Sequence, residues 1–286
     1  MGENVPRWFR TALAAEPEHL DTEVDGARVH LRCWGPPDTP GLVLVHGGAA
    51  HSAWWDHIGP FLAAGRVVAL DLSGHGDSDR RPAYDLEIWA REVLGAAEAG
   101  RIAGPPLVIG HSMGGWIAAT VGARYGHEAG GVVIVDSPLD SQPPEEARMR
   151  RDRGLRRYPD RAAILDRFVT IPPQEVEPYI HRHIAEQSVR ETDGAWTWKF
   201  DPAAFAERVL LREVLPAIKC RAAFFRSEFG LLPPSKVDDL AALLGPRVPM
   251  VELPDAGHHP MLDQPLALVT ALRMLIRQWA VDDLPD

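Results

Sequence analysis

The sequence predicts an α/β protein, in which a parallel sheet is covered by helices on both faces and is interrupted by one helical insertion. The first observation is a rhythm of short, continuous apolar runs that alternate with longer helical segments. This rhythm is typical of a parallel sheet buried on both faces. The second observation is that the rhythm stops near residue 139 and resumes near residue 215. The length of 286 residues is sufficient for such a core with an insertion.

The expected strands are the apolar runs. An antiparallel hairpin comes first, with strands at 22–24 and 29–34 around the turn Asp25-Gly26. The strands that follow it are expected at 42–45, 66–70, 107–109, 132–135, 222–225 and 248–253. Core helices are expected at 86–99, 116–125 and 266–279, and insertion helices at 145–157, 161–168 and 175–187. Residues 1–20 are expected to form a mobile or loosely docked lead-in.

Composition disfavours several classes of protein. A hydrophobic content of 45% and a charged content of 24% are those of an ordinary soluble globular protein. The net charge of −10 disfavours a nucleic-acid partner. Cys33 and Cys220 lie far apart, which disfavours a disulfide scaffold or a cysteine metal site. Neither a secretory signal nor an apolar stretch of about 18–20 residues is visible, so we expect a cytoplasmic protein without a membrane partner.

The most informative motif is G-H-S-M-G at residues 110–114, which follows an apolar run and precedes an Ala-rich segment. It has the G-x-S-x-G form of a nucleophile elbow, a sharp strand-to-helix turn that exposes a serine hydroxyl. Small flanking residues are needed because the strand and the helix pass close to each other. The helix that follows directs backbone N–H groups and its positive dipole end towards the turn. Ser112 is therefore the candidate nucleophile.

A second glycine motif, H-G-G at residues 46–48, comes directly after the expected strand 42–45. A loop at this place supplies an oxyanion donor in sheets of this kind, and glycine lets the backbone turn its N–H towards the pocket. The N–H groups of Gly48 and Met113 are therefore the candidate oxyanion donors.

Two adjacent histidines follow the last expected strand, in P-D-A-G-H-H-P at residues 254–260. A histidine on this loop can reach the elbow at the carboxyl edge of the sheet and accept the serine proton. We predict that His258 is the general base. His259 precedes a proline and is expected to support the site or to start a helix.

These motifs together make the chain resemble the α/β-hydrolase fold enzymes that carry a helical cap. The resemblance includes V-H-G-G at 45–48 with Trp54-Trp55 behind it, D-L-S-G-H-G-D-S at 71–78, the elbow at 110–114, and Gly257-His258. A serine at the elbow argues against the family members that use an aspartate there, the haloalkane dehalogenases and the epoxide hydrolases. The stretch 71–78 is expected to be a structural turn at the floor of the pocket.

The resemblance implies a mostly parallel sheet of eight strands. Residues 1–138 and 215–286 would form the core, and residues 139–214 would form a helical lid. Aromatic residues of this lid, Trp196 and Trp198, are candidate pocket residues together with Trp54 and His111.

The acid that would orient His258 is not where the resemblance places it. Family members usually carry an aspartate after the seventh strand, and Phe229 stands there in this chain. Two replacements are open. Asp136 ends the sixth strand, and Glu228 lies one residue from the usual position. Both keep the order serine, acid, histidine along the chain, and we favour Asp136.

The expected function is hydrolysis of an ester, lactone or thioester of a small, partly apolar substrate through an acyl-enzyme, with no cofactor and no metal. One alternative on the same fold is a cofactor-free oxygenase, or a carbon–carbon or hydroxynitrile lyase, that uses His258 as base. A third is a ligand receptor without catalysis. The sequence carries no indication of oligomeric state.

Overall fold

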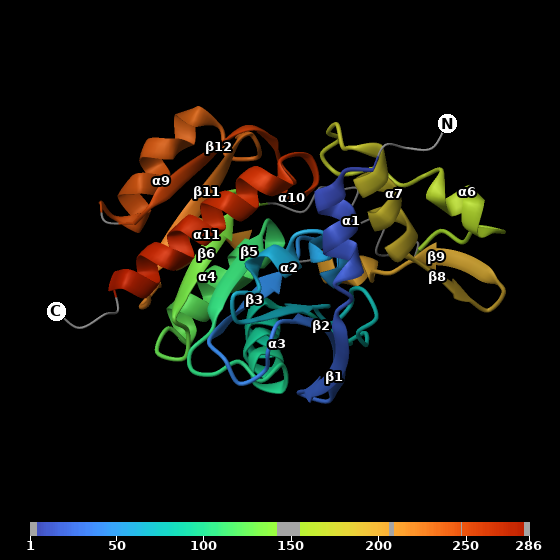
Figure 1. Ribbon diagram of the computed structural model, residues 1–286, viewed down its shortest axis with the longest axis horizontal. Helices are drawn as coiled ribbons and strands as arrows, with labels where there is room; N and C mark the ends of the chain where they lie inside the picture. Colours follow the sequence, from blue (N-terminus) through green and yellow to red (C-terminus); the bar gives the residue numbers. More distant parts are fainter. Residues whose placement is uncertain (1–4, 142–154, 206–208, 247, 283–286) are drawn as a thin grey trace.

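An eight-stranded sheet forms the centre of the computed structural model, which describes residues 5–141, 155–205, 209–246 and 248–282 (Figure 1). The strand order is β1-β2-β4-β3-β5-β6-β11-β12. Both pairings of β2, with β1 and with β4, are antiparallel, and the other neighbours pair in parallel. The strands are β1 (Glu18–Val24), β2 (Ala27–Trp34), β3 (Gly41–Val45), β4 (Arg66–Leu70), β5 (Leu107–His111), β6 (Gly131–Val135), β11 (Ala222–Phe229) and β12 (Met250–Gly257). The predicted fold class is confirmed.

The central strands are continuously apolar because both faces of the sheet are covered. Along β3, Leu42 and Leu44 belong to one buried cluster, and Val43 and Val45 belong to another. Side chains of α2 (Gly59–Leu62) and α11 (Pro265–Asp282) fill the first cluster. Side chains of α3 (Leu86–Ala99) and α4 (Met113–Arg124) fill the second. A strand in this position must be apolar at every residue rather than at every second one.

The remaining core helices are short or peripheral. They are α1 (Arg7–Ala14), α9 (Val237–Leu244), α10 (Pro260–Asp263), and the 3-10 turns η1 (Ser52–Trp55), η3 (Leu215–Ala217) and η4 (Pro234–Lys236). The predicted helix at 86–99 is found at these bounds, with the Asp85 side chain accepting a hydrogen bond from the Ile88 amide at 2.7 Å. The expectation of a loosely docked lead-in is wrong for α1, because Phe9 is buried and its ring centroid lies 4.8 Å from that of Tyr179.

The segment between β6 and β11 contains strands as well as helices. It comprises β7 (Asp140–Ser141), α6 (Arg161–Leu165), α7 (Pro178–Gln187), β8 (Val189–Thr192), β9 (Ala195–Trp198), η2 (Pro202–Phe205), β10 (Val209–Leu210) and α8 (Leu211–Val214). Most of the predicted helix 145–157 lies outside the described residues, and 155–157 are not helical.

The expectation of a mostly helical insertion is therefore wrong in one respect, because the insertion also contains a β-hairpin. A β8–β9 hairpin projects at the edge of the molecule (Figure 1). Its turn is Asp193-Gly194, and both residues have positive φ (50° and 71°). Asp-Gly is a preferred pair for a two-residue hairpin turn, and the aromatic residues of β9 favour strands. The Asp-Gly pair and the aromatic residues are visible in the sequence, but the Arg-, Glu- and Pro-rich residues around them favoured the expectation of helices.

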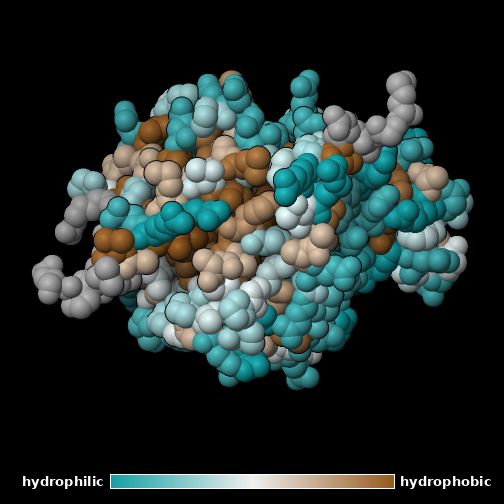
Figure 2. All heavy atoms as spheres, viewed as in Figure 1, coloured by the Kyte–Doolittle hydropathy of each residue, from teal (hydrophilic) through white to brown (hydrophobic). Residues whose placement is uncertain are grey.

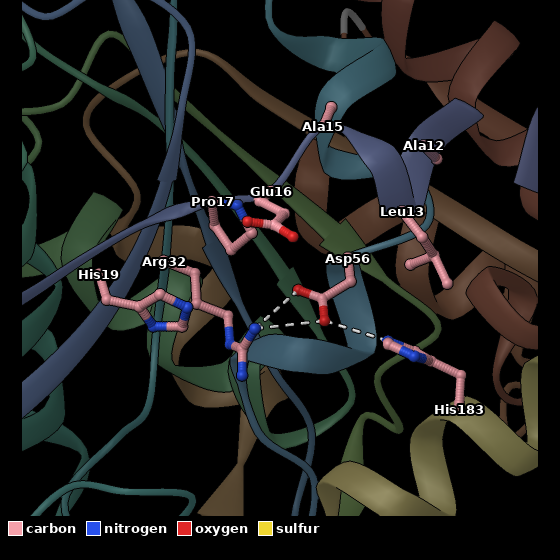
Figure 3. Close-up of a pocket in the computed structure, with 9 residues that line it drawn as sticks. All are labelled: Ala12, Leu13, Ala15, Glu16, Pro17, His19, Arg32, Asp56 and His183. Carbon is pink, nitrogen blue, oxygen red and sulfur yellow. Dashed lines mark hydrogen bonds and ion pairs between the residues drawn. The ribbon is translucent and has the colours of Figure 1, made fainter. Parts of the chain in front are cut away.

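Polar contacts attach this segment to the core at several places, two of which include an ion pair. Asp56, just after η1, accepts hydrogen bonds from Arg32 of β2 at 3.3 Å and from His183 of α7 at 3.0 Å, and these three side chains converge in Figure 3. At the second place, Lys199 forms an ion pair with Asp77 at 2.8 Å. The insertion is thus joined to β2 and to the 71–78 loop.

The surface differs between the two ends of the molecule. On the face in Figure 2, hydrophobic residues gather along α11, and the side of the β8–β9 hairpin is mainly hydrophilic. Among the exposed large apolar residues of α11 are Leu266 and Met274. No helix within the described part of the chain is long and apolar enough to cross a membrane.

Candidate active site

Ser112 lies on a sharp turn between β5 and α4. Its backbone has φ 54° and ψ −116°, a conformation that L-residues rarely adopt. The Ser112 amide donates to the Val135 carbonyl of β6 at 2.9 Å, which ties the turn to the neighbouring strand. A Cβ atom on Gly110 would lie 2.0 Å from the Gly114 oxygen, and one on Gly114 would lie 2.4 Å from the Val45 oxygen. The two glycines are therefore required by the close approach of strand and helix.

A continuous line of hydrogen bonds joins three of the predicted site residues. His258 Nε2 lies 3.0 Å from Ser112 Oγ, and His258 Nδ1 lies 2.7 Å from Asp136 Oδ2. The His258 and Asp136 side chains are almost completely buried, at 3% and 0% exposed. The carboxylate fixes the N–H on Nδ1, which leaves the Nε2 lone pair directed at the serine hydroxyl. This arrangement can take a proton from Ser112 and return it.

Asp136 follows β6 and is held by the loop that follows β11. Its Oδ1 accepts the Ser227 amide at 3.2 Å, and its Oδ2 accepts the Leu231 amide at 2.9 Å. A Cβ atom on Gly230 would lie 2.2 Å from Asp136 Oδ1, so this loop can approach only with glycine. The loop where a family member usually carries the acid thus supplies backbone donors to an acid from the adjacent strand.

Glu228, the other acid considered, is not brought to His258. Its Oε2 accepts a hydrogen bond from the Asp255 amide at 3.0 Å. The neighbouring Phe229 is 67% exposed. The structure therefore brings Asp136, and not Glu228, into contact with the imidazole.

Gly48 and Met113 both line the cavity into which Ser112 opens. Met113 is the first residue of α4, and an amide at that position has no acceptor within its own helix. Gly48 lies in the loop after β3. Because β3 pairs in parallel with β5, the two strands end side by side. Both residues thus border the cavity next to Ser112.

The imidazole rings of His111 and His259 lie next to that of His258. His111 donates from Nε2 to the His258 carbonyl at 2.7 Å, and His259 donates from Nε2 to the Ile171 carbonyl at 3.2 Å. Burial, reinforced by the charge of His258, places the pKa of His111 well below its usual value. The same causes lower the pKa of His259 to about 3. His259 also begins α10, as expected. Both rings are neutral near pH 7.

The three histidines form the one group among the described residues that could hold a metal ion. One ring nitrogen from each of His111, His258 and His259 lies within 4.8 Å of the others.

The cavity has a volume of about 960 Å³ and mostly apolar walls. Its aromatic lining residues are Trp54, Tyr84, Trp89, Trp116, Tyr158, Phe168, Trp198 and Phe200. Predicted residues Trp54, Trp198 and His111 are among the lining. Trp89 and Trp116, on α3 and α4, were not anticipated, because a tryptophan on a core helix has the sequence pattern of an ordinary buried residue.

Trp196 does not line the cavity, so its prediction as a pocket residue is wrong. In the hairpin register it pairs with Glu191, nearer the turn, whereas Trp198 pairs with Val189 at the end next to the core. Trp196 instead bonds through its backbone to Tyr158 and lies 6.0 Å beneath the Arg161 guanidinium.

The stretch 71–78 forms a structural turn. Asp71 is buried, and its carboxylate accepts the amides of Ser52 at 2.6 Å and Asp77 at 2.7 Å. A Cβ atom on Gly76 would lie 2.1 Å from the Asp71 carboxylate. The turn thus supports the loop after β3.

Comparison with protein families gives a match to the model described as "Alpha/beta hydrolase family" over residues 42–272. A monoacylglycerol lipase of Mycolicibacterium smegmatis is 37% identical over 126 residues, which cover 41% of this chain and 45% of the lipase. The chain therefore matches less than half of that relative. An esterase of Mycobacterium tuberculosis is 28% identical over 269 residues, covering 87% of this chain and 86% of the esterase.

Solved structures share the fold. The crystal structure of E-2-(acetamidomethylene)succinate hydrolase superposes with a TM-score of 0.76 and 22% sequence identity, covering 91% of this chain and 100% of that one. At this identity the likeness concerns the fold alone.

Proposed function

The chain belongs to the alpha/beta hydrolase family, and from this premise we propose that it hydrolyses carboxylic esters, or related acyl bonds, through an acyl-enzyme. The observation that carries the proposal is the unbroken line from Asp136 through His258 to Ser112 Oγ. The names of the esterase and lipase relatives agree with this reaction class.

The proposed reaction begins with attack of Ser112 Oγ on the substrate carbonyl carbon. His258 Nε2 accepts the hydroxyl proton as the new C–O bond forms. Negative charge then develops on the carbonyl oxygen, where the Gly48 and Met113 amides would donate to it. Asp136 is the orienting acid, because it holds the N–H on Nδ1 and stabilises the imidazolium that forms.

The second half of the reaction reverses these roles. The imidazolium of His258 gives its proton to the leaving alcohol oxygen, and the acyl group stays on Ser112. A water molecule then loses a proton to His258 Nε2 and attacks the acyl carbon. The bond from that carbon to Ser112 Oγ breaks, His258 returns the proton to Oγ, and the acid is released. No cofactor takes part in these steps.

We propose a small, partly apolar substrate, since eight aromatic residues line the cavity and its lining also includes polar side chains. Residues 139–214 would act as a lid on the core formed by 1–138 and 215–286. Trp198, from the lid, and Trp54 and His111, from the core, would contact the substrate.

The test is the intact mass of the protein after exposure to a fluorophosphonate, with the Ser112→Ala variant treated in parallel. A single adduct on the native chain and none on the variant is the expected result. Turnover of a panel of p-nitrophenyl esters and lactones then identifies the acyl group. If the folded native chain gives no adduct, Ser112 is not activated and the acyl-enzyme mechanism is refuted. Oxygen uptake with an aromatic hydroxy-ketone would then test the oxygenase alternative.

A further inference from the structure

The cavity beside Ser112 opens to solvent at a rim whose residues differ from those of the cavity walls. At the inner end His258 is buried and Ser112 is half-buried. The large lining residues that are exposed come from the insertion and from the loop after β11, and they are Arg156, Arg167, Val169, Ile171 and Leu231. The cavity therefore leads from a covered reacting end to an exposed rim, where a bound molecule would place its far end.

The charge of the rim is opposite in sign to the charge of the chain. Arg156 and Arg167 line the cavity, whereas no aspartate or glutamate is among its described lining residues. The whole chain has 30 Lys and Arg residues against 40 Asp and Glu residues. Because a guanidinium stays protonated at any ordinary pH, this rim is positively charged in a protein that is negatively charged overall.

Neither rim arginine is neutralised by a described carboxylate. The neighbouring Arg157 shows the contrast, since it forms an ion pair with Asp193 at 3.9 Å and donates to the Thr192 carbonyl at 2.8 Å. Arg156 and Arg167 form no ion pair within the part of the chain that the structure describes. Their guanidinium groups therefore keep N–H donors for an anion from outside, and the planar group can donate to it through two parallel hydrogen bonds.

Aromatic residues of the cavity wall accompany both arginines. The Arg156 guanidinium carbon lies 5.1 Å from the centroid of the Tyr158 ring, and Tyr158 is 9% exposed and lines the cavity. A cation over a ring face is attracted to it and still has its N–H groups free at the edge. Arg167 directly precedes Phe168, another lining residue, and its amide donates to the Ile164 carbonyl at 3.0 Å. The backbone of each arginine is thus adjacent to the wall.

The walls favour an apolar body between the two ends of a substrate. The cavity of about 960 Å³ is lined mostly by aromatic and aliphatic side chains. Val169 and Ile171 remain apolar at the rim, although they are 66% and 70% exposed. Walls of low dielectric constant strengthen the attraction between a cation and an anion and raise the local concentration of anions. The complementary molecule has a reacting carbonyl, an apolar body and a negatively charged far end.

We propose that the substrate is an ester whose apolar body carries a carboxylate or a phosphate remote from the reacting carbonyl, and that Arg156 and Arg167 bind this anion at the rim. The proposal rests on the ester hydrolysis proposed above and specifies its substrate class. The anion takes no part in bond making or breaking, and its binding holds the carbonyl at Ser112.

Titrations followed by tryptophan fluorescence test the binding, because tryptophans line the cavity. The Ser112→Ala background prevents consumption of the ester probes. Monomethyl suberate carries the carboxylate and dimethyl suberate is its neutral match, whereas octyl phosphate is matched by octanol. We expect at least one anion to bind about tenfold more tightly than its neutral match, as for one hydrogen bond between charged groups. The pair with the larger preference identifies the anionic group.

Arginine variants in the same background locate the anion. Arg156→Gln or Arg167→Gln should reduce the preference for the anion about tenfold, because each removes a charged donor. Arg157→Gln is the matched control, since its guanidinium binds the hairpin and does not line the cavity. Added salt should also reduce the preference, because the rim is exposed. Circular dichroism establishes that each variant is folded.

Turnover of p-nitrophenyl hemisuberate and of its methyl ester, with Ser112 intact, tests the substrate class. The anionic ester should have the lower KM at similar kcat, and the arginine variants should raise that KM. The proposal is overturned if neither anion is preferred over its neutral match, or if both folded arginine variants keep the full preference. Arginine-dependent binding without turnover of any ester supports the rim site and refutes hydrolysis, and turnover without any preference does the reverse.

Discussion

The two sides of the cavity are built by different means. On the core side, every residue of β4 and β6 is buried, and the reacting groups sit where such strands end. On the insertion side, all four residues of β9 are partly exposed. The difference indicates that the proposed reacting groups are held at the ends of completely buried strands, whereas the opposite wall is held by a partly exposed hairpin and its contacts with the core. Core substitutions should therefore change the chemistry or the stability, and insertion substitutions should change substrate choice.

The largest effect is expected for a substitution on the core side of the cavity. Ser112→Ala removes the attacking oxygen and should lower kcat for ester hydrolysis roughly 10⁶-fold. The melting temperature should change by no more than a few degrees, because the serine side chain donates to no structural acceptor. Stopped-flow or steady-state assays together with thermal unfolding measure both. Comparable turnover in the variant would remove Ser112 from the mechanism.

The second-largest effect is expected for substitution of the orienting acid, Asp136. Asp136→Asn keeps the shape of the side chain but removes the charge that fixes the His258 tautomer, so kcat should fall roughly 10⁴-fold. Glu228→Gln is the matched control, since its carboxylate accepts the Asp255 amide and does not contact His258 within the described structure, and its kcat should be nearly native. The opposite order of the two variants would make Glu228 the acid.

Stability should respond differently to glycine substitution on the two sides. Gly114→Ala places a Cβ atom 2.4 Å from the Val45 oxygen and should lower the free energy of unfolding by about 2–3 kcal/mol. Gly194→Ala, in the hairpin turn, meets no atom within 4 Å and bears only the strain of a positive φ, about 1 kcal/mol. Urea titration of both variants provides the measurement. A larger loss for Gly194→Ala would contradict the comparison.

Acid should weaken the core through His57. Burial lowers the pKa of His57 from the usual 6.5 to about 4. Below pH 6.5 the unfolded chain binds a proton that the folded chain accepts only near pH 4, so acid favours unfolding in this window. The contribution is about 2 kcal/mol between pH 7.5 and pH 5. Urea unfolding should show this loss in the native chain and less of it in His57→Gln. An unchanged pH dependence in the variant would exclude His57 as its source.

The smallest effect is expected on the insertion side. Trp198→Ala should raise KM about tenfold for esters with bulky apolar acyl groups and leave acetyl esters nearly unaffected. Trp196→Ala, two residues away and outside the cavity, is the control. If kcat fell for every ester alike, the insertion would contribute to the chemistry itself.

These regions also differ in how far the sequence predicts them. The strands from 42–45 to 132–135 were found within one or two residues, because burial on both faces leaves a continuous apolar signal. Two positions stayed open for the acid, since β6 and β11 are neighbours and their ends converge on one point. Only the spatial arrangement distinguishes Asp136 from Glu228.

The insertion was predicted less well. Its hairpin depends on Asp193-Gly194 and on contacts between β9 and distant residues such as Tyr158. The alternation of apolar and polar residues in four-residue strands is too short to separate from helical spacing. Trp89 of α3 and Trp116 of α4 line the cavity because of how these helices are placed relative to the insertion. A local sequence pattern does not contain this information.

The short pairing of β7 with β10 has an evolutionary consequence. Asp140 pairs with Leu210 and Ser141 with Val209, so the chain leaves the core and returns to it at adjoining points. A segment with neighbouring ends can be lengthened, shortened or exchanged without shifting the strands on either side. Replacement of the whole excursion in the course of evolution is therefore expected to leave the core strands in place while it changes the wall of the cavity.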